Sequence, residues 1–351
     1  MINNSKINIF WAYTEYHLLC CLNLALTSFA DNDYENRIYY VKGIRRLNYE
    51  LKPIEGLNGF VQSIEYTKKL AQAKLLKIEK CERFFFFQEG SILDKYLAFY
   101  LKKLGAIICL APDGSKPYAI FNKKHETLSM IKDTVSDYVF LLKNKLILPA
   151  FFRSRYYRYG STRIIDEVWL QQPELFNPNL NRTKGKLIQM PLFELSNMAK
   201  IAEAFGLKTE NISDKEHILL YINQPLWSEK LVEYEISILL KILDVFPGIT
   251  INIKLHPNTP SNTISFYRKL DRVNLIKENY PAELYISLIK KSIIISGWST
   301  ALMQYNNSNN YYYLLPMFEQ LGDRILSQVK IMPLSHIKVV KSIDEINFPD
   351  N

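Results

Sequence analysis

The sequence has few cysteines, and they lack the spacing of a metal site or a disulfide framework. Only four are present, at Cys20, Cys21, Cys81 and Cys109. No two of them form a Cys-x-x-Cys pair, and most have apolar neighbours in the sequence. We therefore expect four buried thiols in a reducing compartment and no bound metal.

The chain also lacks the marks of secreted and membrane-spanning proteins. Its N-terminus enters a predicted strand without a charged and then apolar leader. It contains no uninterrupted run of about eighteen apolar residues, the length that a spanning helix needs. The nearest candidate, 138–152, is interrupted at Lys143, Asn144 and Lys145. We therefore expect a cytoplasmic protein, and we leave open a peripheral contact with the inner membrane.

Hydrophobic residues and positive charge, in contrast, are abundant. Hydrophobic residues make up 48% of the 351 residues, and a chain of this length favours two domains over one. The formal net charge is +9. This surplus favours an acidic partner, such as a nucleotide, an anionic sugar, a nucleic acid or a membrane surface, without choosing among them.

Predicted strands and helices alternate along the chain. In the first half the predicted strands are 7–12, 37–42, 60–66, 83–87, 106–110 and 164–170. In the second half they are 218–222, 249–255, 273–276, 292–296 and 311–315. This alternation favours mostly parallel sheets.

A polar stretch, 206–215, separates the two halves. We therefore predict an α/β fold with two Rossmann-like βαβ domains, 1–209 and 210–351, and a cleft between them. We leave open whether the last residues pack back on the first domain.

The strand at 249–255 ends at a histidine–proline pair. Proline cannot donate a hydrogen bond to a sheet, so His256 and Pro257 lie at the strand's carboxyl end, where open α/β sheets bind ligands. His256 could act there as a general acid or a phosphate ligand, or it could be a partly buried histidine that caps a turn. Lys254 lies on the same predicted face and would favour an anion, although a lone lysine is usually only solvated.

The strand at 292–296 ends in a turn that is rich in hydroxyl groups. Ser296, Gly297, Ser299 and Thr300 precede a predicted helix, whose N–H groups and dipole would favour a phosphate. An ordinary N-cap explains the same residues equally well. Glu283, at the start of another predicted helix, could bind ribose hydroxyls or simply complement the helix dipole.

Two acidic–glycine pairs, Asp113-Gly114 and Glu89-Gly90, follow strands in the first half. Glycine permits a sharp turn and the close approach of a ligand. An aspartate at such a turn can act as a general base. An ordinary turn is the alternative for both pairs, since Asp-Gly is a common turn sequence.

Two weaker candidates complete the set. His17, after the first strand, could face the cleft or be a loop histidine with local partners. Arg153 and Arg155 belong to a basic and aromatic segment, 151–160, that could hold an anionic acceptor, a lipid surface or single-stranded RNA. A solvated surface is the default interpretation of this segment.

Taken in order, these pieces resemble the bacterial sialyltransferases of the GT-B fold, of the polysialyltransferase and lipooligosaccharide sialyltransferase types. The first strand and residues 14–19, Thr-Glu-Tyr-His-Leu-Leu, are similar to the opening of those families. Asp113-Gly114 resembles their acidic-acidic-glycine motif, the segment 254–257 their His-Pro motif and Ser299-Thr300 their paired-serine motif. The order and spacing of these motifs fit across nearly the whole chain.

One departure from the family pattern concerns the catalytic base. The family motif has two acidic residues before the glycine, and the first is usually assigned as the base. In this chain Pro112 occupies that position. Asp113 could take the role, Glu89 could supply the base instead, or the activity could differ.

The resemblance implies a metal-independent, inverting transfer of sialic acid from CMP-sialic acid to a hydroxyl of a surface glycan, with no cofactor. Asp113 would deprotonate the acceptor, and His256 would protonate or hydrogen-bond the departing phosphate. The donor-binding residues would be Gly114, Lys254, Pro257, Glu283, Ser296, Gly297, Ser299 and Thr300. The acceptor-side candidates are His17, Glu89, Arg153 and Arg155.

Other functions stay open at this point. One is a GT-B transferase that uses another CMP- or UDP-activated sugar. Another is a non-catalytic glycan- or nucleotide-binding homologue, which Pro112 motivates. Only the charge supports an RNA-binding protein, and because no RNP, KH or zinc-finger pattern is present we expect no nucleic acid partner.

Overall fold

The computed structural model divides the chain into two compact units, Met1–Leu192 and Phe193–Asn351. It describes residues 5–42, 51–114, 116–118, 126–147, 159–181, 183–207, 218–276, 280–323 and 334–347. The polar stretch 206–215 lies mostly outside these residues, so a domain boundary at 209/210 stays a prediction.

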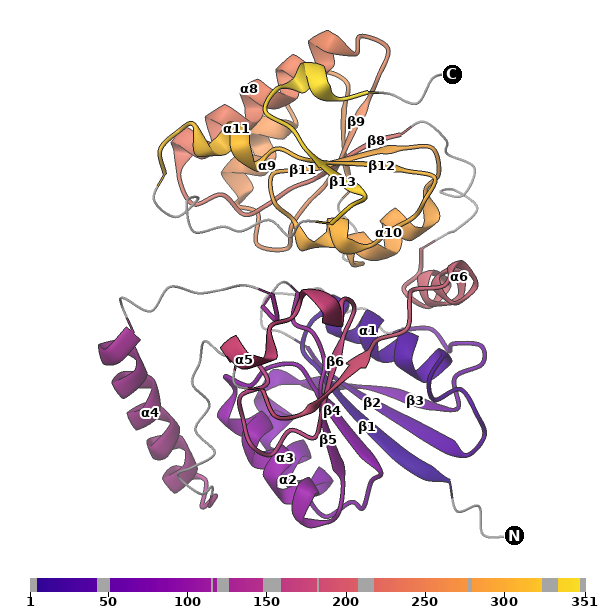
Figure 1. Cartoon of the computed structure of the whole chain (residues 1–351), viewed down its shortest axis with the longest axis vertical. Helices are drawn as coiled ribbons and strands as arrows, with labels where there is room; N and C mark the ends of the chain where they lie inside the picture. The colour runs from indigo at the N-terminus through magenta and orange to yellow at the C-terminus, as the bar shows by residue number, and fades with distance from the viewer. Residues whose placement is uncertain are drawn as a thin grey trace. The chain divides into compact units, whose positions relative to one another are not determined.

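Unit 1 is built around seven parallel strands (Figure 1). In chain order these are β1 (Lys6–Ala12), β2 (Tyr34–Lys42), β3 (Gly59–Glu65), β4 (Arg83–Phe86), β5 (Ile107–Leu110), β6 (Glu167–Leu170) and β7 (Lys186–Gln189). Across the sheet the order is β3-β2-β1-β4-β5-β6-β7. The order reverses between β1 and β4, as in doubly wound folds, whose ligands bind at the carboxyl ends of the strands beside that reversal.

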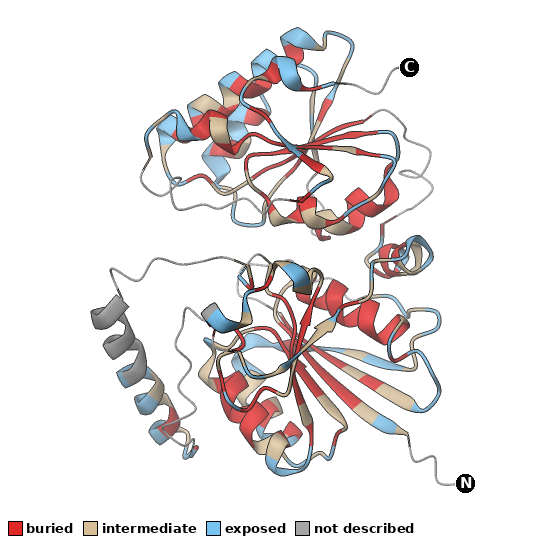
Figure 2. Ribbon diagram, in the orientation of Figure 1, coloured by how far each residue is buried: buried red, intermediate tan, exposed pale blue. Residues whose placement is uncertain are grey.

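Helices cover both faces of this sheet. The helix α1 (Glu15–Leu26) lies over one face, and α2 (Lys69–Leu76) and α3 (Ile92–Lys103) lie over the other (Figure 1). Strands covered on both sides must be apolar throughout. The four phenylalanines at 84–87 are accordingly buried, like the strand centres in Figure 2.

The remaining elements of unit 1 are short or peripheral. They are the helices α4 (Glu126–Lys143) and α5 (Pro178–Asn181) and the 3-10 turns Tyr66–Lys68 and Pro173–Leu175. The sequence pattern predicted the other six strands but not β7, which is a half-exposed edge strand that begins with a lysine. An edge strand with one side in solvent lacks the apolar run that marks a central parallel strand.

Unit 2 repeats the same design with six parallel strands. They are β8 (Leu219–Ile222), β9 (Ile251–Lys254), β10 (Val273–Ile276), β11 (Ile293–Ser296), β12 (Asn310–Tyr313) and β13 (Ile337–Val339). Their order is β10-β9-β8-β11-β12-β13, with the reversal between β8 and β11. The α/β fold of two parallel, Rossmann-like sheets is therefore confirmed, although the short edge strand β13 was not predicted.

The helices of unit 2 bury apolar stripes against its sheet and against one another. They are α6 (Leu195–Ala204), α8 (Glu229–Val245), α9 (Ser261–Tyr267), α10 (Ala282–Leu288) and α11 (Leu315–Glu319), with 3-10 turns at Thr300–Met303 and Ile343–Glu345. The helix α8 begins where the Ser228 hydroxyl accepts the Leu231 N–H, at 3.4 Å. Its buried residues recur every three or four positions, which is the pattern of one helix face.

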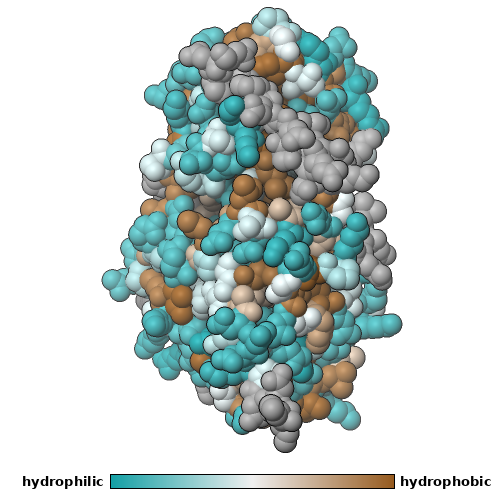
Figure 3. Space-filling view, turned by 90° about the vertical axis from the view of Figure 1, so that its right-hand side faces the viewer, coloured by the Kyte–Doolittle hydropathy of each residue, from teal (hydrophilic) through white to brown (hydrophobic). Residues whose placement is uncertain are grey.

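The structure bears on the expectations about the cysteines and about the membrane. All four cysteines are buried free thiols, as predicted. Within the described ranges, no helix combines the length and the apolar character needed to cross a bilayer. On the face drawn in Figure 3, hydrophobic side chains form several groups among hydrophilic ones. Peripheral contact with a membrane stays a prediction.

Candidate active site

At the carboxyl edge of the first sheet, His17 is held in the first turn of α1. Thr14 caps this helix, and its hydroxyl accepts the His17 N–H at 3.0 Å. The imidazole is fully buried and stacks on Phe87, which follows β4, with ring centroids 4.1 Å apart. His17 therefore bridges the ends of β1 and β4, the two strands between which the sheet order reverses.

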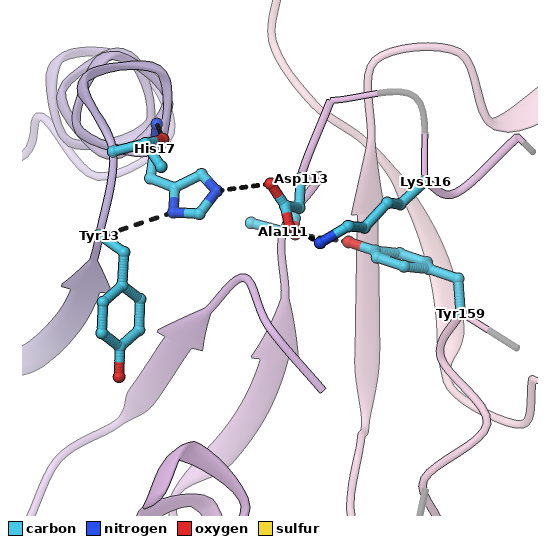
Figure 4. A network of polar contacts seen from close by, with 7 residues as sticks. Tyr13, His17, Ala111, Asp113, Lys116 and Tyr159 are labelled. Carbon is cyan, nitrogen blue, oxygen red and sulfur yellow. Dashed lines mark hydrogen bonds and ion pairs between the residues drawn. The ribbon is translucent and has the colours of Figure 1, made fainter. Parts of the chain in front are cut away.

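The His17 ring forms a hydrogen bond with Asp113, which follows β5, the neighbour of β4 in the sheet (Figure 4). Its Nε2 lies 3.0 Å from Asp113 Oδ1, and its Nδ1 accepts the Tyr13 N–H at 3.3 Å. A main-chain N–H can only donate, so Nδ1 carries no proton and Nε2–H donates to the carboxylate. The pair is a neutral imidazole that holds an ionised acid.

The Asp113 carboxylate is largely enclosed but keeps some access to solvent, with 17% of its side chain exposed. Its second oxygen accepts a hydrogen bond from the Lys116 ammonium group (Figure 4). Burial by itself would raise the pKa of Asp113, but the hydrogen bond from His17 and the charge of Lys116 outweigh it and hold the pKa below its ordinary value. The side chain is therefore ionised at neutral pH.

The backbone around Asp113 explains the residue types on either side of it. Gly114 has a φ of 60°, a left-handed conformation that glycine adopts without strain. Pro112, at the position of the family's first acidic residue, is buried. The preceding Ala111 carbonyl accepts a hydrogen bond from the Tyr159 hydroxyl (Figure 4). Asp113 is thus the acidic side chain that this turn presents.

Glu89, the second acidic candidate, is already bound by the protein. One of its carboxylate oxygens accepts the Gly160 N–H at 2.5 Å. The other accepts both the N–H and the hydroxyl of Thr162, at 3.1 and 2.7 Å. Burial raises the pKa of Glu89, and these hydrogen bonds act in the opposite direction. These contacts connect the loop after β4 to the 159–162 turn. A role for Glu89 as base or acceptor ligand stays a prediction, as do those of Arg153 and Arg155, which lie outside the described residues.

In unit 2, the His-Pro turn follows β9 as the sequence indicates. The Asn258 N–H donates to His256 Nδ1 at 3.1 Å, so the ring proton of a neutral His256 resides on Nε2. Lys254 is buried at the end of β9, with its ammonium nitrogen 5.2 Å from the centroid of the Tyr280 ring. A cation and a hydrogen-bond donor therefore accompany this strand end.

Glu283 lies near Lys254, in the first turn of α10. Burial raises the pKa of Glu283 to about 7, and the charge of Lys254 acts against that rise. A carboxyl group with this pKa can both donate and accept hydrogen bonds near neutral pH. This property suits a ribose diol, although binding of ribose stays a prediction.

The serine turn after β11 uses several of its polar groups internally. The Ser296 hydroxyl donates to the Ile222 carbonyl at 2.8 Å and accepts the Ser299 N–H at 3.1 Å. Ser299 caps the one-turn 3-10 helix at 300–303 by accepting the Ala301 N–H at 3.3 Å. Gly297 does not have a positive φ. These contacts are those of an N-cap, and a phosphate site at Ser299 and Thr300 stays a prediction.

Sequence reasoning missed a group of polar residues behind the His-Pro turn, most of them buried. They are Tyr221, Asn223, Glu235, Thr259 and Tyr267. Two signals could have found them. Asn223 directly follows a strand beside the sheet reversal, and Glu235 occupies a position in the apolar stripe of α8.

The described residues contain no group of three or more His, Cys, Asp or Glu side chains that could hold a metal ion. The expectation that the protein needs no cofactor stays a prediction. The chemistry available is that of an ionised carboxylate on one sheet, and of an imidazole, a lysine and a carboxyl group on the other.

Two doubly wound sheets in one chain, each with polar side chains at its carboxyl edge, are the architecture of the GT-B fold. Solved structures agree with this fold. A 2,6-sialyltransferase of Photobacterium sp. JT-ISH-224, in complex with CMP and lactose, superposes with a TM-score of 0.57 at 11% identity, over 95% of this chain and 78% of that one. A sialyltransferase of Photobacterium damsela gives 0.57 at 12% identity, over 96% and 81%.

The sequence itself decides the family. Residues 36–311 match the model of the alpha-2,8-polysialyltransferase family (POLYST), and the chain belongs to this family. It is therefore a GT-B sialyltransferase, and the predicted resemblance and the predicted enzyme class are both confirmed. A search of the curated proteins found no match.

Proposed function

We propose that this enzyme transfers sialic acid from CMP-sialic acid to a hydroxyl group of a capsular or lipooligosaccharide glycan, with inversion and without a metal. The observation that carries the proposal is Asp113, an ionised carboxylate positioned by His17 at the carboxyl edge of the first sheet. Family membership supports sialyl transfer, and the Photobacterium sp. JT-ISH-224 enzyme, which has CMP and lactose in its complex, supports the donor and the glycan acceptor.

In the proposed reaction the bond between the anomeric carbon and the phosphate oxygen of CMP breaks as the acceptor hydroxyl bonds to the opposite face. The transition state resembles an oxocarbenium ion, as in glycoside chemistry generally. The acceptor oxygen becomes strongly acidic as it bonds to this cation. A carboxylate whose pKa is lowered is therefore still basic enough to receive its proton, and we assign that role to Asp113.

The leaving phosphate would be stabilised by the second sheet. Because His256 Nδ1 accepts a main-chain N–H, its Nε2–H is the group that can donate to a phosphate oxygen. Donation without full proton transfer is favoured, since a neutral imidazole that lost its Nε2 proton would become an anion. Lys254 would add positive charge, Ser299 and Thr300 would hold the phosphate, and Glu283 would bind the ribose.

The departure at Pro112 leaves another activated sugar as the second candidate. Isothermal titration with CMP, UDP and GDP separates the two. We expect binding of CMP, and binding of UDP without CMP would reject the sialyl donor.

The decisive assay follows transfer from CMP-sialic acid to glycan acceptors in the presence of EDTA. We expect transfer by the wild-type enzyme and a loss of roughly 10²- to 10⁴-fold in kcat for Asp113→Asn, since this is the usual contribution of a general base. Binding of CMP by the variant serves as the control for folding. An Asp113→Asn variant with wild-type kcat would remove Asp113 from the mechanism.

A further inference from the structure

A buried acid lies within the apolar stripe of α8, behind the His-Pro turn. Glu235 is only 1% exposed and lies between Val232 and Ile238 on the inward face of the helix. A carboxylate without partners in such a place would be strongly destabilising. Glu235 is instead the end of a chain of hydrogen bonds that leads to His256.

Two tyrosine hydroxyls donate to the Glu235 carboxylate. Tyr221, on β8, donates to Oε1 at 2.6 Å, and Tyr267, the last residue of α9, donates to Oε2. A phenol has one proton, so Tyr267 can only accept from its next neighbour. That neighbour is Asn223, whose Nδ2 donates to the Tyr267 oxygen at 2.7 Å.

This chain of bonds decides which way the Asn223 amide faces. The two ends of an amide have nearly the same shape, so their surroundings determine their positions. With Nδ2 directed at Tyr267, the carbonyl oxygen Oδ1 faces the His-Pro turn. There it accepts the Thr259 hydroxyl and, at 3.5 Å, the His256 N–H.

Asn223 thus contacts both ends of the turn that carries the imidazole. Its main-chain N–H also donates to the Lys254 carbonyl, at 3.1 Å. Within the turn, the Thr259 N–H donates to the His256 carbonyl at 2.9 Å and the Asn258 N–H donates to His256 Nδ1. The orientation of the imidazole therefore depends on a turn that Asn223 holds.

We propose that Asn223 is a positioning residue for His256, and that Glu235, acting through Tyr267, orients the Asn223 amide for this task. The proposal rests on the proposed function only where it assigns His256 to the donor phosphate. Tyr221 is the other tyrosine that donates to Glu235, and it has no hydrogen bond to Asn223. It therefore supplies a matched control.

The test compares Tyr267→Phe with Tyr221→Phe in the full-length enzyme. Each variant removes one hydroxyl from Glu235 and keeps the ring. Assays are run at pH 8, where Glu235 is mostly ionised although burial raises its pKa to about 7. We expect kcat/KM for CMP-sialic acid to fall roughly threefold to tenfold in Tyr267→Phe, as loss of one buried hydrogen bond implies, and less than twofold in Tyr221→Phe.

A double-mutant cycle separates positioning from general destabilisation. In a His256→Ala background the Tyr267→Phe change should have no further effect on kcat/KM, because it acts through the imidazole. Equal losses in the two tyrosine variants, or a Tyr267→Phe effect that persists without His256, would overturn the proposal.

A second measurement does not depend on the donor. Hydrogen–deuterium exchange of the peptide over 255–260 should be faster in Tyr267→Phe and Asn223→Ala than in the wild type and in Tyr221→Phe. If the wild type fails to use CMP-sialic acid, the proposed function fails, and exchange alone then decides the positioning role. Unchanged exchange in Asn223→Ala would reject it.

Discussion

At the residue scale, the contact between His17 and Asp113 determines the charge state of the candidate base. The carboxylate is mostly enclosed, and burial alone would favour its neutral form. The donated hydrogen bond and the nearby Lys116 reverse this preference. An ionised carboxylate that retains some access to solvent can take a proton from the hydroxyl group of the acceptor sugar. A carboxyl group that is already protonated cannot.

Replacing His17 should therefore change the acidic limb of the pH profile. Without its hydrogen bond, burial of Asp113 is less opposed, so we expect the pKa of Asp113 to rise in His17→Ala and the loss of kcat/KM to begin at a higher pH. At neutral pH we expect a loss of roughly tenfold to hundredfold, typical of a hydrogen bond to a charged group. The measurement is kcat/KM against pH.

His17→Gln and Lys116→Ala are the matched variants for this profile. A glutamine amide can still donate to Asp113 and should restore part of the activity. Lys116 is 56% exposed, so its removal should raise the pKa of Asp113 less. An acidic limb that does not move in His17→Ala would show that Asp113 is not the titrating group.

At the element scale, single carboxylates connect or interrupt otherwise regular structures. Glu89 joins the loop after β4 to the 159–162 turn through three hydrogen bonds. Glu235 interrupts the apolar stripe of α8 and is stabilised by two tyrosines. Burial of either carboxylate costs free energy, so replacing either one should change the free energy of unfolding.

We expect Glu89→Gln to lower the free energy of unfolding of the protein by about 1–3 kcal/mol. The glutamine would turn an NH₂ group toward donors that need an acceptor, and an unsatisfied buried donor has a cost of this size. Urea denaturation measures the change. Thr162→Val removes one of the three hydrogen bonds and should have a smaller effect, whereas an equal or larger effect would contradict this account.

The pH dependence of stability should report the burial of Glu235. Its pKa is about 7 in the folded protein, against 4.5 ordinarily. Between these values the folded protein holds a proton that the unfolded chain has released, so the free energy of unfolding falls as the pH rises. The loss should reach up to about 3 kcal/mol, from 2.5 pH units at about 1.36 kcal/mol each.

The amide introduced by Glu235→Gln does not titrate. This variant should therefore lack the part of the fall in the free energy of unfolding that Glu235 causes. Its free energy of unfolding, relative to that of the wild type, should therefore increase from pH 5 to pH 7. Glu283→Gln should show a similar change, because burial raises the pKa of that carboxyl group to about 7 as well. Parallel curves for Glu235→Gln and the wild type would contradict a raised pKa.

At the scale of the whole molecule, both units place their polar residues at the carboxyl edge of a doubly wound sheet. Such an edge, beside a reversal in strand order, is where nucleotides bind in this architecture. His256, Lys254 and Glu283 belong to unit 2, and Asp113 belongs to unit 1. Because these residues belong to different units, a mutation should be able to remove nucleotide binding without removing proton abstraction, and the reverse.

We therefore expect CMP to stabilise the protein against unfolding, by about 2.7 kcal/mol at a concentration of 100 times its Kd. Thermal denaturation with CMP and with UDP measures this effect. Asp113→Asn should keep the stabilisation and His256→Ala should lose part of it. Equal stabilisation by UDP would argue for a different donor.

Much of the fold and part of the site could be predicted from the sequence. The apolar runs that form β4 and β11 identify central parallel strands, and the proline after His256 marks the end of β9. The edge strands β7 and β13 have no such run and were missed. The polar chain from Glu235 through Tyr267 to Asn223 was missed because its three members belong to α8, to α9 and to the turn after β8.

The sequence by itself determined the family, the alternation of strands and helices, and the residue types at the strand ends, because these depend on local patterns and short motifs. Only the tertiary structure decided that His17, 96 positions from Asp113, donates to it, and that Glu235 orients Asn223. Hydrogen bonds between distant segments depend on strand order and burial, and no local pattern of side chains specifies either.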